Sequence, residues 1–383
     1  MKNIWIAWCV VFCAQLAWAQ AIPAPKLQCV NNDALNSNVM LHWSNSGNPC
    51  GGTFNGYKIY AASTFNGTYT LVTTITNENQ TNYIDAGRLS QGNKWFYYME
   101  ADYDCPGFQT LQSDTIENAP PATPEIVSVD VTPSNQVVIN WQQSISPQTN
   151  QYILYYALPN GNAQPFDTIL GRATISATDA SVDPTISSIA YTIAAADSCN
   201  KISSFNIKPQ RTMLLTYATS QCERSINLKW TRYENWNAGI KEYRILVSKN
   251  LQPFEVVGTT DTAAQVFSFS NFNDGDSLCI SIVAVNAGDT NIVSHSNYAC
   301  FVPSIVQSPN YLYPVNASVN IDNTVSVTWL VDSTSELLFY QVDGSNNGAQ
   351  FNLLEQYNVP SPLTQFETYI DSASLPQTNS DRK

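Results

Sequence analysis

The chain has 383 residues, of which 30 are acidic and 17 are basic, and its formal net charge is −13 at pH 7. This charge repels phosphate backbones and the sequence has no basic cluster to offset it, so nucleic acid is excluded as a partner. Charged residues make up 12%, about half the fraction usual in soluble proteins, because Ser, Thr, Asn and Gln supply most of the polarity. Such a surface suits an extracellular β-protein.

Residues 1–19 read as a secretory signal peptide. Lys2 precedes an apolar run that ends at Trp18, and AWA at its end supplies a small-x-small cleavage pattern. No later stretch approaches the roughly 20 apolar residues that a membrane-spanning helix needs. We therefore expect a secreted or cell-surface protein without a transmembrane segment in its mature chain. Cys9 and Cys13 fall in the removed peptide, which leaves an odd number of cysteines in an oxidising compartment.

Four segments alternate apolar and polar residues and end in tryptophan, as a strand with one buried face does. They are NVMLHW, QVVINW, SINLKW and TVSVTW, which end in Trp43, Trp141, Trp230 and Trp329. A second strand follows each of them and carries a tyrosine with an aliphatic residue two places on. These tyrosines are Tyr57, Tyr152, Tyr243 and Tyr340. The recurrence predicts four copies of one domain, with the tryptophans and tyrosines in their cores.

Turn residues punctuate these strands about every ten positions, and helical periodicity is absent. The segments LSQGNKWFYYMEA and FNDGDSLCISIVA place a leucine or phenylalanine, a glycine and a large residue at the same spacing before another alternating strand. About seven short strands in each 90 to 100 residues are typical of a sandwich of two sheets. The predicted fold class is all-β.

The strand-B tryptophan, strand-C tyrosine and Leu-x-x-Gly step resemble fibronectin type III domains, which have an immunoglobulin-like fold. Residues 222–260 closely resemble repeats of secreted Bacteroidetes proteins that end in a gliding-motility-associated C-terminal domain, and ADSCN at 196–200 is similar to a phrase in those proteins. Leu278 departs from the family pattern, since an aromatic residue is usual before strand F. The second copy also lacks a clear Leu-x-x-Gly step.

The resemblance implies a semi-rigid, elongated array of tandem sandwiches. Proline and small polar residues cluster at 118–125, 208–212 and 302–309, which we expect to be linkers. The predicted divisions are a signal peptide at 1–19 and fibronectin type III-like domains at 22–118, 122–210, 211–303 and 308–383.

In such a sandwich the B–C and F–G loops lie at the same end, so the resemblance implies a disulfide between Cys50 and Cys105. Cys279 would begin strand F and Cys300 would end strand G, which places them side by side. Each bridge would stabilise the fold by about 3 to 4 kcal/mol on the chain-entropy account.

Three cysteines remain. Cys199 falls in an F–G loop that faces the preceding domain, where Cys29 on strand A is within reach. By the same reasoning, Cys222 would pair with a cysteine in an F–G loop of the fourth domain that lies beyond this sequence. A Cys199–Cys222 bridge is the alternative connectivity, and the sequence leaves both open.

Spacing within one copy predicts where the fourth copy stops. The distances from Trp43 to Trp95, from Trp141 to Tyr191 and from Trp230 to Leu278 are 52, 50 and 48 residues, and each marks the approach to strand F. The same distances from the fourth tryptophan place strand F at 377–381. We therefore expect a fragment that is truncated before strands F and G. The resemblance implies that the lost part carries a sorting domain for type IX secretion.

The sequence offers no catalytic constellation, cofactor site or metal site. His42 is expected to face outward from strand B and His295 to lie in the polar start of strand G, and no Gly-x-Ser-x-Gly, CxxC or HExxH pattern occurs. NDGD at 273–276 has too few spaced oxygens for a calcium loop and reads as a turn. Trp236 in the B–C loop is a candidate ligand contact, against the alternative that it caps the core. DTI at 114–116 and again at 167–169 resembles an O-glycosylation triplet, but turns produce it freely.

These observations favour a non-catalytic, secreted or cell-surface stalk or adhesin-like protein that contacts an extracellular protein or glycan. Its link to the secretion machinery would lie in the missing C-terminal region. The alternative is an accessory region, either spacer or carbohydrate-binding, of a secreted enzyme whose catalytic domain lies outside this sequence.

Overall fold

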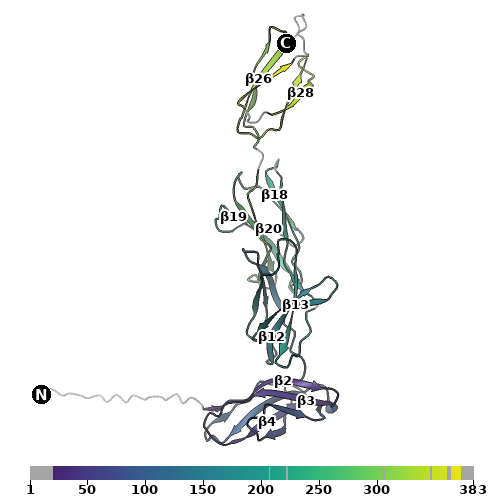
Figure 1. Ribbon diagram of the computed structural model, residues 1–383, viewed down its shortest axis with the longest axis vertical. Coiled ribbons are helices and arrows are strands. Elements are labelled where there is room, and N and C mark those ends of the chain that lie inside the picture. Colours follow the sequence, from purple (N-terminus) through teal and green to yellow (C-terminus); the bar gives the residue numbers. More distant parts are fainter. Residues whose placement is uncertain are drawn as a thin grey trace, which may run out of the picture.

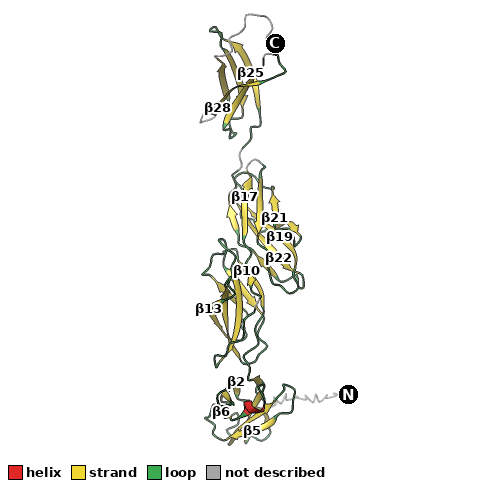
Figure 2. Cartoon of the chain, turned by 90° about the vertical axis from the view of Figure 1, so that its right-hand side faces the viewer, coloured by secondary structure: helices red, strands yellow, loops and turns green. Residues whose placement is uncertain are grey.

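The computed structural model describes residues 20–206, 208–220, 223–304, 307–345, 347–359 and 364–371. The predicted signal peptide and Cys222 lie outside these ranges, as do the positions expected for strand F of the fourth copy. The described chain folds into four successive β-sandwiches with a single 3-10 turn, η1 (Arg88–Gln91). They follow one another along an elongated array (Figures 1 and 2).

The first sandwich consists of two facing antiparallel sheets. One sheet has the order β2 (Lys26–Asp33), β3 (Asn38–Ser44), β6 (Asn82–Asp85). The other has the order β5 (Thr70–Ile75), β4 (Phe54–Ala62), β7 (Phe96–Tyr103), β9 (Ile116–Glu117). A short parallel pair, β1 (Ala21–Ile22) and β8 (Gln109–Thr110), adds to this sandwich.

The second sandwich repeats this plan. Its three-stranded sheet has the order β10 (Ile126–Val131), β11 (Val137–Trp141), β14 (Ser176–Asp179). Its four-stranded sheet has the order β13 (Ala163–Leu170), β12 (Thr149–Ala157), β15 (Ala190–Asp197), β16 (Gln210–Arg211).

The third sandwich pairs a sheet of order β17 (Leu215–Ser220), β18 (Ser225–Trp230), β21 (Val266–Phe269) with a five-stranded sheet. The latter runs β20 (Glu255–Thr260), β19 (Ile240–Lys249), β22 (Leu278–Asn286), and both β23 (Val293–His295) and β24 (Ala299–Phe301) pair with β22. The fourth sandwich has the sheet β25 (Leu312–Val319), β26 (Val325–Val331), β29 (Phe366–Asp371) and the two-stranded sheet β27 (Phe339–Gly344), β28 (Asn352–Asn358).

One aromatic contact bridges the two sheets of every sandwich. The tryptophan that ends strand B is buried and meets the buried tyrosine of strand C edge to face. The four ring-centroid distances are 6.1 Å for Trp43 and Tyr57, 5.4 Å for Trp141 and Tyr152, 5.6 Å for Trp230 and Tyr243, and 5.1 Å for Trp329 and Tyr340. The interplanar angles lie between 61° and 70°, which is the geometry that aromatic quadrupoles favour. Strand alternation thus builds the same core four times.

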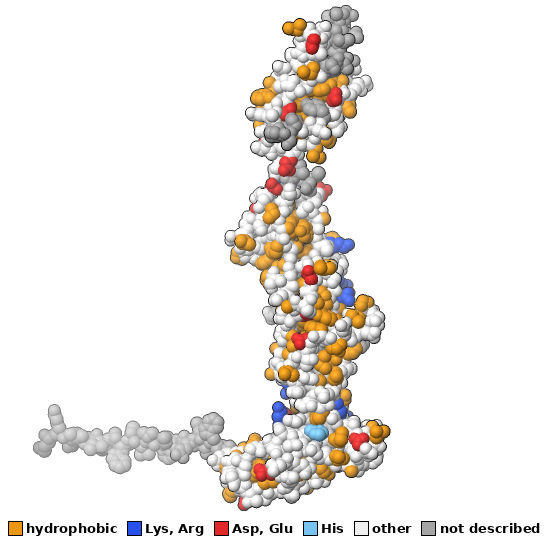
Figure 3. Space-filling model, viewed as in Figure 1, with side chains coloured by type: hydrophobic (Ala, Val, Ile, Leu, Met, Phe, Trp, Pro, Cys, Tyr) orange, Lys and Arg blue, Asp and Glu red, His pale blue; other side chains and the backbone are white. Residues whose placement is uncertain are grey.

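The array is bent at its first junction. The first sandwich lies across the long axis of the others instead of continuing it, as Figure 1 shows. The expectation of an elongated array is met, and at the bend Cys29 on β2 joins the first sandwich to the second through its disulfide with Cys199. Few charged side chains lie on the face of the molecule that Figure 3 shows, consistent with the low charged fraction of the sequence.

We predict that Trp141→Ala destabilises the second sandwich by about 3–5 kcal/mol, because it removes a large buried side chain and leaves a cavity. Hydrogen exchange with mass spectrometry, read on peptides of each sandwich, measures the loss. Leu35→Ala is the control: its side chain is 98% exposed, so its effect should stay within about 0.5 kcal/mol. Similar losses in both variants would contradict the assigned core.

The fourth sandwich should lose stability in acid. The Asp332 carboxylate accepts hydrogen bonds from the Thr334 hydroxyl at 2.6 Å and the Asn310 side-chain amide at 2.6 Å, and these donors lower its pKa to about 2. Because this folded pKa lies below the ordinary 3.8, the stabilisation is complete above about pH 4 and disappears as the pH falls through about 2.

Asp332→Asn should therefore lower the unfolding temperature of this sandwich at pH 6, and the difference from the unmodified chain should vanish near pH 2. Differential scanning calorimetry across this range measures it, with the exposed Glu355→Gln on β28 as control. A pH-independent difference would refute the assignment.

Candidate functional site at the junctions between sandwiches

The first junction is covalent. Cys29 on β2 is fully buried and forms a disulfide with Cys199, which lies in the loop after β15 of the second sandwich. The bond joins residues 170 positions apart in the sequence. Of the two connectivities that the sequence left open for Cys199, the structure therefore contains the bond to Cys29 of the first sandwich.

A lysine reinforces this junction. The Lys201 ammonium donates hydrogen bonds to the backbone oxygens of Val30 at 3.0 Å and Asn118 at 2.7 Å, both in the first sandwich or its exit. Burial lowers the pKa of Lys201, because the charged form loses water, while the Asp197 charge opposes that shift. The Asp197 carboxylate accepts backbone hydrogen bonds from Cys199 and Lys201, each at 2.9 Å, and so shapes the loop that carries both residues.

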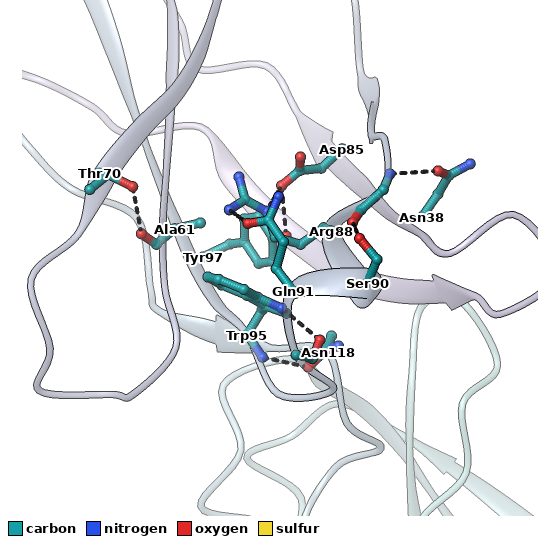
Figure 4. A network of polar contacts seen from close by, with 12 residues as sticks. Asn38, Ala61, Thr70, Asp85, Arg88, Ser90, Gln91, Trp95, Tyr97 and Asn118 are labelled. Atoms are coloured by element: carbon teal, nitrogen blue, oxygen red, sulfur yellow. Dashed lines mark hydrogen bonds and ion pairs between the residues drawn. The ribbon is translucent and has the colours of Figure 1, made fainter.

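Asn118 connects the junction to the interior of the first sandwich, as Figure 4 shows. Its side-chain oxygen accepts from the Trp95 backbone N–H at 2.9 Å. The Trp95 ring lies under the Arg88 guanidinium at 4.6 Å, and Arg88 Nε donates to Asp85 at 2.6 Å. The buried Asp85 also accepts from the Tyr97 hydroxyl at 2.9 Å, and burial raises the pKa of that tyrosine. Asn118, which Lys201 contacts, is therefore held by a network of contacts that extends through Trp95 and Arg88 to the buried Asp85.

The second junction is non-covalent and buried. The Tyr233 hydroxyl, from the loop after β18, accepts the Val129 backbone N–H at 2.8 Å and donates to Gln210 at 2.7 Å. Burial raises the pKa of Tyr233, so it stays a neutral phenol. The Trp236 indole donates to the Val127 backbone oxygen at 2.8 Å and packs against Tyr233 at a centroid distance of 4.2 Å. One loop of the third sandwich thus satisfies backbone groups of β10 in the second.

The start of strand G completes this junction. The Ser294 hydroxyl donates to the Val129 backbone oxygen at 2.6 Å. Asp130 accepts from the His295 backbone N–H at 2.6 Å, and His295 Nδ1 lies 2.9 Å from the same carboxylate oxygen. Beyond it, the Asn135 amide exchanges two hydrogen bonds with the backbone of Tyr298, at 2.8 and 3.2 Å. Side chains and backbone of the third sandwich therefore bond to Val127, Val129 and Asp130 of β10.

Trp236 takes the second of its two expected roles: it is only 8% exposed and belongs to the buried core of the third sandwich, as the core-capping alternative predicted. Its N–H is also committed to Val127 of the second sandwich, which the sequence did not predict. His295, expected on the surface, is half-buried between two sandwiches and faces Asp130. His42 lies on β3 with a half-buried side chain.

The other two disulfides stay within single sandwiches. Cys50, in the loop after β3, is bonded to Cys105, which follows β7. Cys279 and Cys300 are direct partners on the antiparallel strands β22 and β24 and are bonded to each other. These two bonds constrain sandwiches, whereas the Cys29–Cys199 bond constrains a junction.

The described residues contain no group of three His, Cys, Asp or Glu side chains that could hold a metal ion. In NDGD the Asp276 carboxylate accepts from the Asn273 backbone N–H at 2.8 Å and from the Asn250 amide at 2.9 Å, so it closes a turn. In the same ranges, no helix is long and apolar enough to cross a membrane.

No protein-family model and no curated protein matches the chain. Among solved structures, the FN1–FN3 domains of chicken CNTN1 are similar to it, with 13% sequence identity and a TM-score of 0.21 over 74% of this chain and 100% of that chain. The fold follows from the strand orders and repeated cores given above. The described chain is a tandem array of fibronectin type III-like β-sandwiches.

Tyr233→Phe should uncouple the second and third sandwiches. The change keeps the ring but leaves the buried Val129 N–H without its acceptor, which costs about 1–3 kcal/mol. We expect faster hydrogen exchange in peptides that contain β10 and a calorimetric transition that separates into two. Tyr217→Phe is the matched control, since Tyr217 is exposed. Unchanged exchange at β10 would show that the hydroxyl does not hold this junction.

Proposed function

We propose that this chain is a non-catalytic extracellular spacer whose first three sandwiches are held in a fixed relative orientation. The observation that carries the proposal is the character of the two junctions. Neither depends on a flexible linker alone, because side chains from one sandwich satisfy backbone groups of the next.

The first junction combines a disulfide with a desolvated ammonium. Relative motion of the two sandwiches would have to move Lys201 away from two backbone oxygens while the nearby disulfide stayed closed. Such motion is opposed both by the covalent bond and by the loss of charge-assisted hydrogen bonds.

The junction between the second and third sandwiches is held by buried hydrogen bonds and not by a disulfide. The phenol of Tyr233, the indole of Trp236 and the hydroxyl of Ser294 all bond to the backbone of residues 127–129. Separating the sandwiches would expose three polar groups that are now satisfied away from bulk water, so the cost of partial opening is high.

The role of a spacer is to hold something at a distance, and we propose that exposed loops and sheet faces contact an extracellular protein or glycan. Disulfides and the signal-like N-terminal sequence support placement outside the cell. Export by the type IX route and surface attachment are proposed on the resemblance of residues 222–260 alone.

Distance measurements test the fixed orientation. Fluorophores attached through unnatural amino acids at Leu35 and Leu251 would report on the first and third sandwiches, since these side chains are 98% and 93% exposed. Single-molecule energy transfer should give one narrow distance distribution. Replacing both Cys29 and Cys199 by serine should broaden it, because the covalent part of the junction is lost.

The matched control replaces Cys50 and Cys105 by serine, which removes a disulfide inside one sandwich and should leave the distribution narrow while that sandwich remains folded. A broad distribution in the unmodified chain, or equal broadening in both variants, would rule out the rigid spacer.

A further inference from the structure

A pocket of about 250 Å³ lies between the second and third sandwiches, beside the hydrogen bonds that join them. The second sandwich contributes Glu125, which precedes β10, and Gln142, which follows β11. The third contributes residues 236–238 from the loop after β18 and residues between 286 and 292 at the end of β22. These two loops are the B–C and F–G loops, on which antibodies build their recognition sites.

The pocket is already formed without a ligand. The side-chain oxygen of Asn286 accepts hydrogen bonds from the backbone N–H groups of Gly288 at 2.7 Å and Asp289 at 3.1 Å, and so shapes the F–G loop. The Asn237 side-chain amide donates to a Glu125 carboxylate oxygen at 2.6 Å and ties the B–C loop to the second sandwich. Both walls of the pocket are therefore held in place by the protein itself.

A nearly buried donor faces this pocket. Asn286 is only 8% exposed and lines the pocket, and within the described chain its side-chain nitrogen donates to no group. This nitrogen is not sealed inside the protein, so it is reached through the pocket. The amide of Gln142 likewise has no partner among the described residues and can both donate and accept. A nearly buried donor without a partner calls for an acceptor on a ligand.

The charges of the pocket restrict what it can hold. Glu125 and Asp289 line it, and its described lining residues include no Lys, Arg or His. The Asn237 amide bonds to one oxygen of Glu125 and the Asn291 amide to one oxygen of Asp289, at 2.6 and 3.0 Å, which leaves the second oxygen of each carboxylate for a ligand. Two carboxylates without a balancing cation would repel an anionic ligand.

A hydroxyl is the group that suits both kinds of side chain. It can donate to the carboxylates of Glu125 and Asp289 and accept from the Asn286 nitrogen, whereas an ammonium group or a metal ion offers that nitrogen no acceptor. Trp236 and Ile292 supply apolar wall for the C–H face of a sugar ring. The volume lies below the roughly 300 Å³ at which pockets for drug-sized ligands begin, so a ligand of one ring fits.

We propose that this pocket binds a single neutral sugar ring at the end of an extracellular glycan, with the ring hydroxyls between Asn286 and the two carboxylates. The proposal rests on the extracellular role proposed above for the source of the sugar, whereas the site itself rests on the contacts of this junction. Because both sandwiches contribute to the pocket, a bound sugar would also add contacts between them.

Saturation-transfer difference NMR on the full chain tests this site. The probes are the methyl glycosides of glucose, galactose and mannose, in which the methyl group takes the place of the rest of a glycan. At least one of them should bind saturably. The uronic acid of the same sugar should bind at least about tenfold more weakly, because Glu125 and Asp289 repel its carboxylate.

Substitutions in the pocket locate the binding. Asn286→Asp keeps the side-chain oxygen that shapes the loop but removes the donor, and it should weaken binding at least about tenfold. Asn227→Asp is the matched control, since it adds the same charge on the exposed face of β18 and should leave binding unchanged. Gln142→Ala alters an exposed side chain that holds no other described group, so the fold should be kept while binding weakens at least about threefold.

The proposal would be overturned by absence of saturable binding for all three glycosides, by equal affinity for the uronic acid, or by unchanged affinity in both pocket variants. Tighter binding of methyl glucosaminide or of calcium ion would also overturn it, because the ligand would then be a cation. Binding of the free reducing sugars without their glycosides would assign the pocket to free monosaccharides and overturn the glycan. The energy-transfer test of the spacer involves no sugar, so either proposal can fail while the other stands.

Discussion

The edge-to-face contact between the strand-B tryptophan and the strand-C tyrosine is the interaction on which the rest of the molecule depends. In each sandwich this contact joins residues of both sheets across the core, and its centroid distance stays between 5.1 and 6.1 Å in all four copies. In the first three sandwiches the tryptophan N–H has no hydrogen-bond partner. The tryptophan therefore contributes the volume and shape of its ring to the contact between the two sheets.

Two of the loops between strands form the contacts between neighbouring sandwiches. The loop after β18 starts directly beyond Trp230, so the core contact of the third sandwich also orients Tyr233 and Trp236 toward the second. The loop after β15 plays the same part for the first junction, with Asp197 arranging the backbone that presents Cys199 and Lys201. In both cases a core strand ends, and the next few residues satisfy polar backbone of a neighbour. The packing within each sandwich therefore also positions the loop residues that set its orientation relative to the next sandwich.

The repeated strands and their core residues could be predicted from the sequence because alternation with period two is imposed by the strand itself. The Cys50–Cys105 pair followed from which loops share one end of a sandwich. The core-capping role of Trp236 was one of its two predicted alternatives. Its hydrogen bond to Val127 of the second sandwich could not be predicted, because loop residues have no period that reveals which neighbour covers them. Nothing in the sequence marks Asp130 or Ser294 as junction residues. Strand alternation shows which side chains enter the strand's own core, but a polar side chain that bonds to a neighbouring sandwich has the same pattern as one that faces water.

The Cys29–Cys199 bond also decides how the chain would carry tension. A pull applied to the two ends enters at the first residues of β2, crosses the disulfide and continues after Cys199, so the 170-residue span between the two cysteines is bypassed. That span would otherwise release roughly 600 Å of extended chain on unfolding, at about 3.5 Å per residue. Most of the first two sandwiches is thereby removed from the path of force, and extension under tension is left to the third and fourth sandwiches. Reduction of the Cys29–Cys199 disulfide would expose the first two sandwiches to the applied force and allow this span to extend.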